Sequence, residues 1–203
     1  MGRIPFEAQM QRLNLGCGQY PKAGFLNVDV DPLAKADVFH DLSSFPYPFE
    51  DTRFDLVEMD HVLEHLPSPR DAMREIWRIL KPGGTLRLRV PHFSRGFSHY
   101  DHKCGFDVTF PLYFDPTFPG GYTGIPFEHV QTRLVWFAQP WLKRQVLGNF
   151  AFNVGKMLGM VFDALGNIAP LATSRLFCFW VGGYEEITFE LRRPYANQGG
   201  VRP

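Results

Sequence analysis

The chain has 203 residues and a formal net charge of zero, with 45% of its residues hydrophobic and 21% charged. This length and apolar content predict one domain with its own core and exclude a disordered chain. Without net positive charge the chain has no field that attracts phosphate backbones, so we expect no nucleic acid among its partners.

The cysteines and the first residues of the chain indicate in which cellular compartment we expect the protein. Cys17, Cys104 and Cys178 are too few and too scattered for a disulfide framework, which favours a reducing compartment. The first residues hold no apolar segment typical of a secretion signal, and no uncharged apolar run is long enough to cross a bilayer. We therefore expect a cytoplasmic protein with no transmembrane segment.

Short apolar runs alternate with turns at the start of the chain. The first run leads directly into Gly16-Cys17-Gly18. Because such runs lie between turn residues, they predict strands at 13–15, 25–28, 37–41 and 54–59.

A helix follows these strands. Ser68 is a typical N-cap, Pro69 suits the first helical position, and apolar residues recur at helical spacing up to Leu80. The segment Lys81-Pro82-Gly83-Gly84 ends the helix, and 85–90 alternates as a strand. Strands separated by helical or loop crossovers are typical of a parallel α/β sheet.

Two later strands are predicted at 130–137 and 186–192. The second alternates cleanly, which predicts an antiparallel edge or hairpin strand. We expect residues 194–203 to form a loose tail. Since neither a repeat nor a linker is visible, we expect a single domain over 1–203.

Residues 91–129 form a long stretch without regular periodicity that is rich in aromatic residues and histidine. Long irregular segments in compact domains are usually functional lids or disordered, and the aromatic content argues against disorder. We predict an insertion or lid that covers the substrate, with structural packing as the alternative.

Residues 146–168 predict a helix with a stripe of glycines: Gly148, Gly155, Gly159 and Gly166 fall on one line of a helical wheel. Glycine lowers helix propensity, so the stripe should be offset by close packing, either on the chain itself or at a homodimer seam. Membrane attachment is not expected, because the polar face of this helix would be buried on insertion and carries a single lysine.

The residues at the ends of the first strands indicate a ligand-binding site. Glycines at 16 and 18 let backbone N–H groups approach a ligand without obstruction by Cβ atoms. A carboxylate at the end of the next strand can accept both hydroxyl groups of a ribose. Asp29 has that position, and Asp31 is the alternative.

Five segments in order resemble the motifs of class I S-adenosylmethionine-dependent methyltransferases, closest to the small-molecule "type 11" group. They are residues 13–18, 27–30, 49–57, 61–66 and 80–84. The resemblance implies a Rossmann-like doubly wound sheet of about seven strands, mostly parallel with an antiparallel last strand and with helices on both faces. It also implies S-adenosylmethionine as cofactor.

The resemblance places the family's cofactor contacts by position. Gly16, Cys17 and Gly18 would contact the methionine part of the cofactor, and Asp29 the ribose. Asp41 and Leu42 would meet the adenine. Met59 and Asp60, just after the fourth strand, would lie near the sulfonium.

The chain departs from the family at three points. Asn14 stands where the family usually has an acid, and Tyr20 where it has a third glycine. The segment 16–25 is also too short for a full crossover helix, since parallel strands normally need about a dozen residues or more. We expect a clipped helix or a loop there.

Histidines supply the catalytic candidates: His61 and His92, which follow strand ends, and His102, beside Asp101. The spacing His61-x-x-Glu64-His65 matches the inverted zinc-protease motif, but that motif needs a sustained helix, and prolines soon interrupt this segment.

Metal binding is the alternative reading of these histidines. A Mg²⁺ held by Glu64 and His65 would have a single carboxylate ligand. The spacing of His92, His99, His102 and Cys104 matches no structural zinc pattern. We predict no metal.

The predicted function is methyl transfer from S-adenosylmethionine to a small-molecule acceptor or one linked to a glycan or lipid. Two alternatives stay open: a catalytically silent S-adenosylmethionine-binding module and a nicotinamide-dependent dehydrogenase. The dehydrogenase is less favoured, because Pro21 stands where its third glycine belongs and Asp29 comes too early for its acid.

Overall fold

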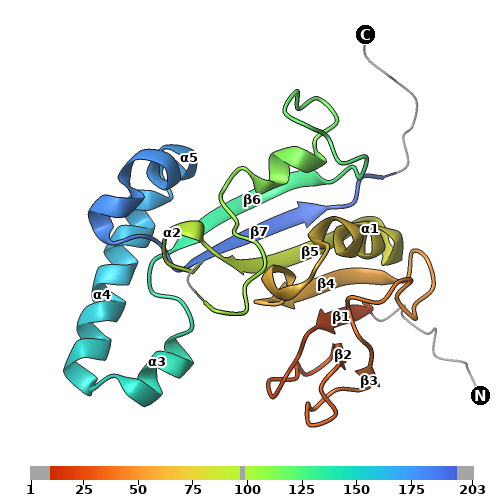
Figure 1. Ribbon diagram of the computed structural model, residues 1–203, viewed down its shortest axis with the longest axis horizontal. Helices are drawn as coiled ribbons and strands as arrows, with labels where there is room; N and C mark the ends of the chain where they lie inside the picture. Colours follow the sequence, from red (N-terminus) through yellow and green to blue (C-terminus); the bar gives the residue numbers. More distant parts are fainter. Residues whose placement is uncertain (1–9, 97–98, 196–203) are drawn as a thin grey trace, which may run out of the picture.

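The computed structural model describes residues 10–96 and 99–195, which form a seven-stranded sheet with helices (Figure 1). The expectations for the first residues and for most of the tail at 194–203 lie outside these ranges. The strands are β1 (Arg12–Leu15), β2 (Leu26–Asp29), β3 (Val38–Phe39), β4 (Phe54–Asp60), β5 (Leu80–Pro91), β6 (Glu128–Val135) and β7 (Glu186–Arg192).

The strand order is β3-β2-β1-β4-β5-β7-β6, and β7 is antiparallel to both of its neighbours. The other pairs, β1 with β2 and β4, β2 with β3 and β4 with β5, are parallel. This confirms the predicted class, a mostly parallel Rossmann-like sheet whose last strand is antiparallel. Of the two positions expected for the strand at 186–192, edge or hairpin, the edge is taken by β6, the preceding strand, which pairs antiparallel with β7.

Helix α1 (Pro69–Ile79) covers one face of the sheet. Ser68 caps it, since its Oγ accepts a hydrogen bond from Asp71 N at 3.3 Å. Its apolar side is fully buried against the inward residues of the central strands. The helical residues buried there are Ala72, Met73, Ile76 and Ile79. Because α1 joins β4 to β5, it holds the far ends of these two strands in register.

The opposite face of the sheet carries charged side chains. Arg87 of β5 lies between Glu58 of β4 and Glu190 of β7, at 3.4 and 3.1 Å. Lys22, from the β1–β2 connection, bridges Glu58 and Asp60 at 2.6 and 2.8 Å. As predicted, residues 16–25 form turns without a helix. In the described residues no helix joins β1 to β2 or β2 to β3, so the helical layer implied for this face is missing there.

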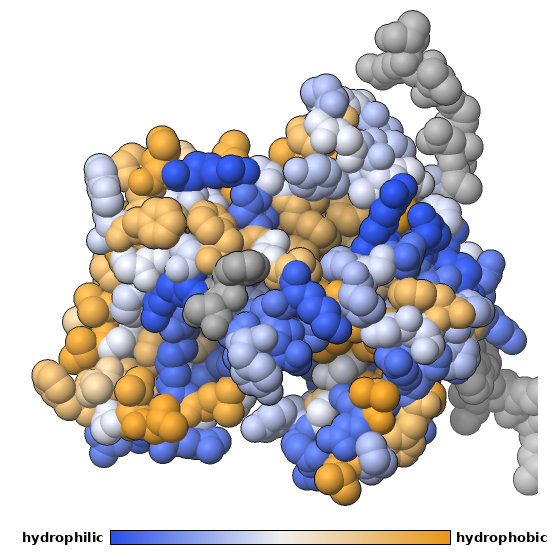
Figure 2. Space-filling view, viewed as in Figure 1, coloured by the Kyte–Doolittle hydropathy of each residue, from blue (hydrophilic) through white to orange (hydrophobic). Residues whose placement is uncertain are grey.

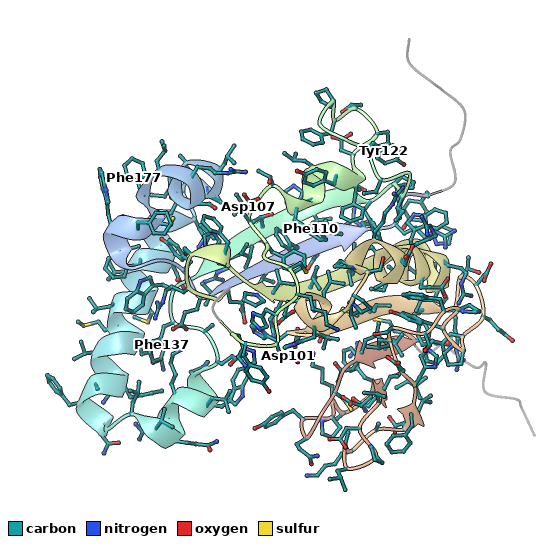
Figure 3. The ribbon with its side chains drawn as sticks, in the orientation of Figure 1. Asp101, Asp107, Phe110, Tyr122, Phe137 and Phe177 are labelled. Carbon is teal, nitrogen blue, oxygen red and sulfur yellow. The ribbon has the colours of Figure 1, made fainter. Side chains whose placement is uncertain are left out.

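Much of the aromatic insertion is core. Phe106, Phe114 and Phe127 are buried, and the Phe110 ring lies 5.7 Å from that of Phe189 in β7 (Figure 3). The helical elements among the described residues of this segment are a short helix α2 (Phe93–Gly96) and a 3-10 turn η2 (Phe110–Phe114). The packing role that the sequence left as an alternative therefore accounts for the later half, and movement as a lid stays a prediction.

Helices α3 (Pro140–Val146), α4 (Asn149–Gly166) and α5 (Pro170–Ala172) pack at the end of the sheet where β6 finishes (Figure 1). Two turns, η3 (Thr173–Phe177) and η4 (Cys178–Val181), lead on to β7. Asp163 of α4 accepts a hydrogen bond from Trp136 N at 2.7 Å. Asn167 exchanges two hydrogen bonds with the backbone of Leu134, both at 2.8 Å. These polar contacts fix α4 to the sheet edge.

The glycine stripe of α4 faces side chains of its own chain. A Cβ on Gly155 or Gly159 would lie 2.7 Å from an atom of Phe137, and one on Gly166 would lie 2.0 Å from Tyr184 Oη. Close packing within the chain therefore explains Gly155, Gly159 and Gly166, which offer no seam to a second copy, whereas nothing lies within 4 Å of a Cβ on Gly148. The outer face of α4 is apolar and exposed, as the left side of Figure 2 shows, at Phe150, Met157, Met160, Val161 and Leu165.

No helix in the described ranges has both the length and the apolar character needed to span a membrane.

We expect Gly159→Ala to destabilise the protein, because the added methyl would overlap Phe137 Cβ, an atom close to the backbone. Overpacking of this kind costs about 1–3 kcal/mol, which outweighs the gain of about 1 kcal/mol in helix propensity. Gly148→Ala is the control, since nothing lies within 4 Å of its Cβ position. Denaturant unfolding measures both. A Gly159→Ala variant more stable than the parent would contradict the packing assignment.

Candidate functional site

The glycine loop crosses the ends of β1 and β2. Gly16 N and Cys17 N both donate to Val28 O, at 2.8 and 3.0 Å. Gly16 and Gly18 have φ of +74° and +49°, which favour glycine. Around a Cβ built on Gly18 nothing lies within 4 Å, so the loop is open there. Cys17 is buried, and burial raises the pKa of its thiol, so it is not a ready nucleophile.

Asp29 ends β2 with a fixed, half-exposed carboxylate. Oδ2 accepts from Gly18 N at 2.7 Å and Oδ1 from Asp31 N at 3.0 Å. The backbone of Asp29 also accepts from His40 N at 2.9 Å, which places Asp41 close to it. Asp41 is exposed and Leu42 is buried. The structure thus brings the predicted residues at 16–18, 29 and 41–42 to one edge of the sheet.

Met59 and Asp60, also predicted near the cofactor, lie on opposite faces of β4. The Met59 side chain is wholly buried in the core, so only its backbone is available. Asp60 pairs with Lys22 and with Arg89, the latter at 3.1 Å. Their cofactor contacts stay predictions.

His61 directly follows β4 and turns the chain sharply. Its φ is +54°, an uncommon conformation for a residue other than glycine. Its Nε2 lies 2.7 Å from Glu186 Oε2 at the start of β7, and its backbone N donates to Arg89 O at 2.9 Å. The turn lays Val62 against the glycine loop, since a Cβ on Gly16 would be 2.2 Å from Val62 Cγ2.

A cavity of about 540 Å³ opens beside this turn. Four segments supply its walls: the end of β4 with the turn η1 (Leu63–His65), the start of the insertion, the β6–α3 connection, and the residue before β7. The lining residues are His61, Glu64, His65, Pro91, Arg95, His99, His102, Ala138, Gln139, Lys143 and Glu185. Two of the three predicted catalytic histidines, His61 and His102, therefore share one cavity.

Two glutamates at this site, Glu185 and Glu186, could not be predicted from sequence. Glu185 pairs with Arg95 at 2.7 Å and with Lys143, and Glu186 holds His61. The two glutamates come more than a hundred residues after the end of β4. No local motif marked them, and only the pairing of β7 with β5 brings them here.

His61 is positively charged at neutral pH in this arrangement. Burial alone would lower its pKa, but the carboxylates of Glu186 and Glu64 raise the pKa to about 9. A histidine in this state donates hydrogen bonds and does not accept a proton.

His92, the third predicted catalytic residue, is fully buried and is not among the residues that line the cavity. Its Nδ1 lies 2.7 Å from Ser94 Oγ and its Nε2 2.9 Å from Ser174 Oγ. Burial lowers its pKa to about 4, so the ring is neutral at physiological pH. This position favours a structural role.

Comparison with known proteins shows which protein family the chain resembles. Residues 13–88 match the family model described as a methyltransferase domain. The predicted family resemblance is confirmed. The chain also matches "Methyltransferase str3" of Strobilurus tenacellus, with 32% identity over 43% of this chain and 34% of that protein. The chain thus spans about a third of this curated relative.

Solved structures show the same fold over nearly the whole chain. A SAM-dependent methyltransferase from Archaeoglobus fulgidus superposes with a TM-score of 0.54, at 17% identity, over 92% of this chain and 87% of that one. The [4+2]-cyclase SpnF superposes with the same TM-score, at 16% identity, over 92% and 75%. The predicted fold agrees with both structures, and the predicted enzyme class agrees with the methyltransferase family model. The second shows that the fold by itself does not fix the reaction.

We expect stability to fall as the pH drops from about 6.5 to about 4, because the unfolded chain then protonates His92 while the folded chain does not. The loss reaches up to about 3 kcal/mol by the pKa difference. His92→Gln should flatten this slope, and the exposed His129→Gln should leave it unchanged. Chemical unfolding at a series of pH values measures it. An equal slope in the parent and in His92→Gln would contradict the assignment.

Proposed function

We propose that the chain binds S-adenosylmethionine across the carboxyl ends of β1–β3 and transfers its methyl group to a small-molecule acceptor, free or linked to a glycan or lipid. The acceptor would occupy the cavity at the end of β4. The observation that carries this proposal is the contact of Val62 with Gly16, because Val62 directly follows His61, which lines the cavity. Donor and acceptor sites are therefore neighbours.

The residues at this edge fit the cofactor. Each oxygen of Asp29 accepts one backbone N–H and has capacity for a further hydrogen bond, as two ribose hydroxyls require. The open space at Gly18 suits close approach of a ligand to the backbone. Asn14 does not take part in this contact, because it is buried and donates to Asn27 Oδ1 at 3.0 Å.

When bound, S-adenosylmethionine supplies an activated methyl group, which passes to a lone pair of the acceptor while the sulfur keeps the electrons of the broken bond. The chain's own contribution is then alignment and exclusion of water. Charged His61 would orient an acceptor atom of partial negative charge, and His102 would contact the acceptor from the insertion. His92 would act from behind, holding the end of β5 through Ser94 and Ser174.

Two finer points belong to the same proposal. A homodimer through α4 would use its exposed apolar outer face, since Phe137 and Tyr184 cover the glycine stripe. A cytoplasmic location is supported by the three cysteines, all of which are free.

We expect Asp29→Ala to weaken the affinity for S-adenosylmethionine about ten- to a hundredfold, because charge-assisted hydrogen bonds to both ribose hydroxyls are lost. Asp31→Ala, whose carboxylate lies next along the chain and is exposed, is the matched control and should change the affinity by less than about twofold. Titration calorimetry measures both, with NAD as a second ligand that should not bind. Tighter binding of NAD than of S-adenosylmethionine would contradict the assignment.

The same variants test transfer. The parent protein, given S-adenosylmethionine with a tritiated methyl group and a metabolite extract, should move label into the small-molecule or lipid fraction. Asp31→Ala should do the same, and Asp29→Ala should lose the activity at a cofactor concentration near the parent's dissociation constant. Cofactor binding without transfer to any fraction would favour the silent binding module.

A further inference from the structure

The carboxylate of Glu64 is the least expected feature of the cavity wall. Its side chain is 1% exposed, and neither carboxylate oxygen accepts a hydrogen bond from the residues that the structure describes. A buried ionised group without such partners costs several kcal/mol, on the order of its desolvation penalty, unless it is paired or coordinates a metal. His61 is one cation beside this carboxylate, but it is shared with the buried Glu186, so a further cation would balance the two carboxylates.

Imidazole nitrogens surround this carboxylate. His61 Nδ1 lies 3.5 Å from Glu64 Oε1, and His65 Nε2 and His102 Nε2 each lie 4.0 Å from it. One nitrogen from each of His65 and His102 and one oxygen of Glu64 all lie within 4.8 Å of one another. His61 is shared with Glu186, so the site that we consider uses the ring nitrogens of His65 and His102 that lie nearest to Glu64.

Outer contacts orient these ligands. His65 Nδ1 lies 3.2 Å from Asp101 Oδ2, which leaves Nε2 directed at Glu64 (Figure 3 labels Asp101). A carboxylate behind the second ring nitrogen is the usual support of a metal-binding histidine. Lys103 N donates to Glu64 O at 2.8 Å, so the backbone itself ties the His102 segment to the turn.

We propose that Glu64, His65 and His102 bind a divalent transition-metal ion, with Zn²⁺ the best match. Two imidazoles and one carboxylate are the ligands that Zn²⁺ accepts at a site with an open fourth position, whereas Mg²⁺ prefers an octahedron of oxygens. Tetrahedral bonds of about 2.0–2.1 Å put ligand atoms about 3.3 Å apart. The two separations from Glu64 Oε1 are 4.0 Å and all three atoms lie within 4.8 Å of one another, so metal binding needs an inward movement of the ligands.

This site differs from the inverted zinc-protease motif that the sequence matches. That motif would use His61 and His65 from one helix, but here the two residues flank the short turn η1 and His61 pairs with Glu186. The third ligand comes from the insertion. The open coordination position faces the cavity, where it would take an oxygen of the acceptor. This last step rests on the proposed function, whereas metal binding does not.

The test uses the tag-free full chain, stripped of metal with a chelator and titrated with ZnCl₂ in a calorimeter. We expect one ion per chain. His102→Ala and Glu64→Gln should weaken binding by more than the roughly 10–100-fold that loss of an outer partner costs. His129→Ala, an exposed histidine of β6, is the matched control and should leave affinity unchanged. Replacement of Zn²⁺ by Co²⁺ should give the strong visible absorption of a four-coordinate ion.

Thermal unfolding separates metal binding from a fold defect. The melting temperature of Glu64→Gln without metal is its own reference, because the substitution removes a buried charge and also a partner of His61. With Zn²⁺, the melting temperature of the parent should rise and that of Glu64→Gln should not. The proposal would be overturned if the parent binds no Zn²⁺, or if Glu64→Gln and His102→Ala bind Zn²⁺ as tightly as the parent does. S-adenosylmethionine titrations on the same samples report the proposed function independently.

Discussion

The hydrogen bond between His61 and Glu186 determines how the site is built. It joins the residue after β4 to the first residue of β7, across the end of β5, at 2.7 Å. The left-handed backbone at His61 is unfavourable by itself, and it persists because the surrounding contacts fix it. Two consequences follow from this one turn: Val62 lies against the glycine loop, and Glu64 points into the buried wall of the cavity.

The two faces of the sheet explain why the site lies where it does. On the α1 side, apolar residues of strands, helix and insertion form one core. On the other side, ion pairs among Lys22, Glu58 and Arg87 take the place of helices, because the β1–β2 connection is short. Ion pairs of this kind contribute little stability each, so the core on the first side carries the fold. The edge proposed to bind the ligand is thus supported by the apolar core on the α1 side of the sheet.

Local signals made the first half of the chain predictable. The positions of Gly16, Asp29 and Asp41 at the ends of strands follow from short stretches of sequence around each residue. Helix α1 is marked by its N-cap and by the periodic spacing of its apolar residues. The strand at 186–192 was also placed correctly, but the sequence did not decide between an edge and a hairpin position, since that depends on pairing with β6. Sequence could not show that Glu64 is buried, that His92 faces inward, or that His102 meets Glu64, because each results from contacts between distant segments. The aromatic content of the insertion likewise gave no sign of which rings enter the core.

The central claim is that the cofactor edge and the β4-end cavity form one continuous site. A crystal structure of the full chain with S-adenosylhomocysteine tests it most directly. The account predicts the ribose hydroxyls on the Asp29 carboxylate and the sulfur directed past Val62 toward the cavity that contains His61 and His102. A cofactor bound elsewhere, or one whose sulfur is directed away from this cavity, would contradict it.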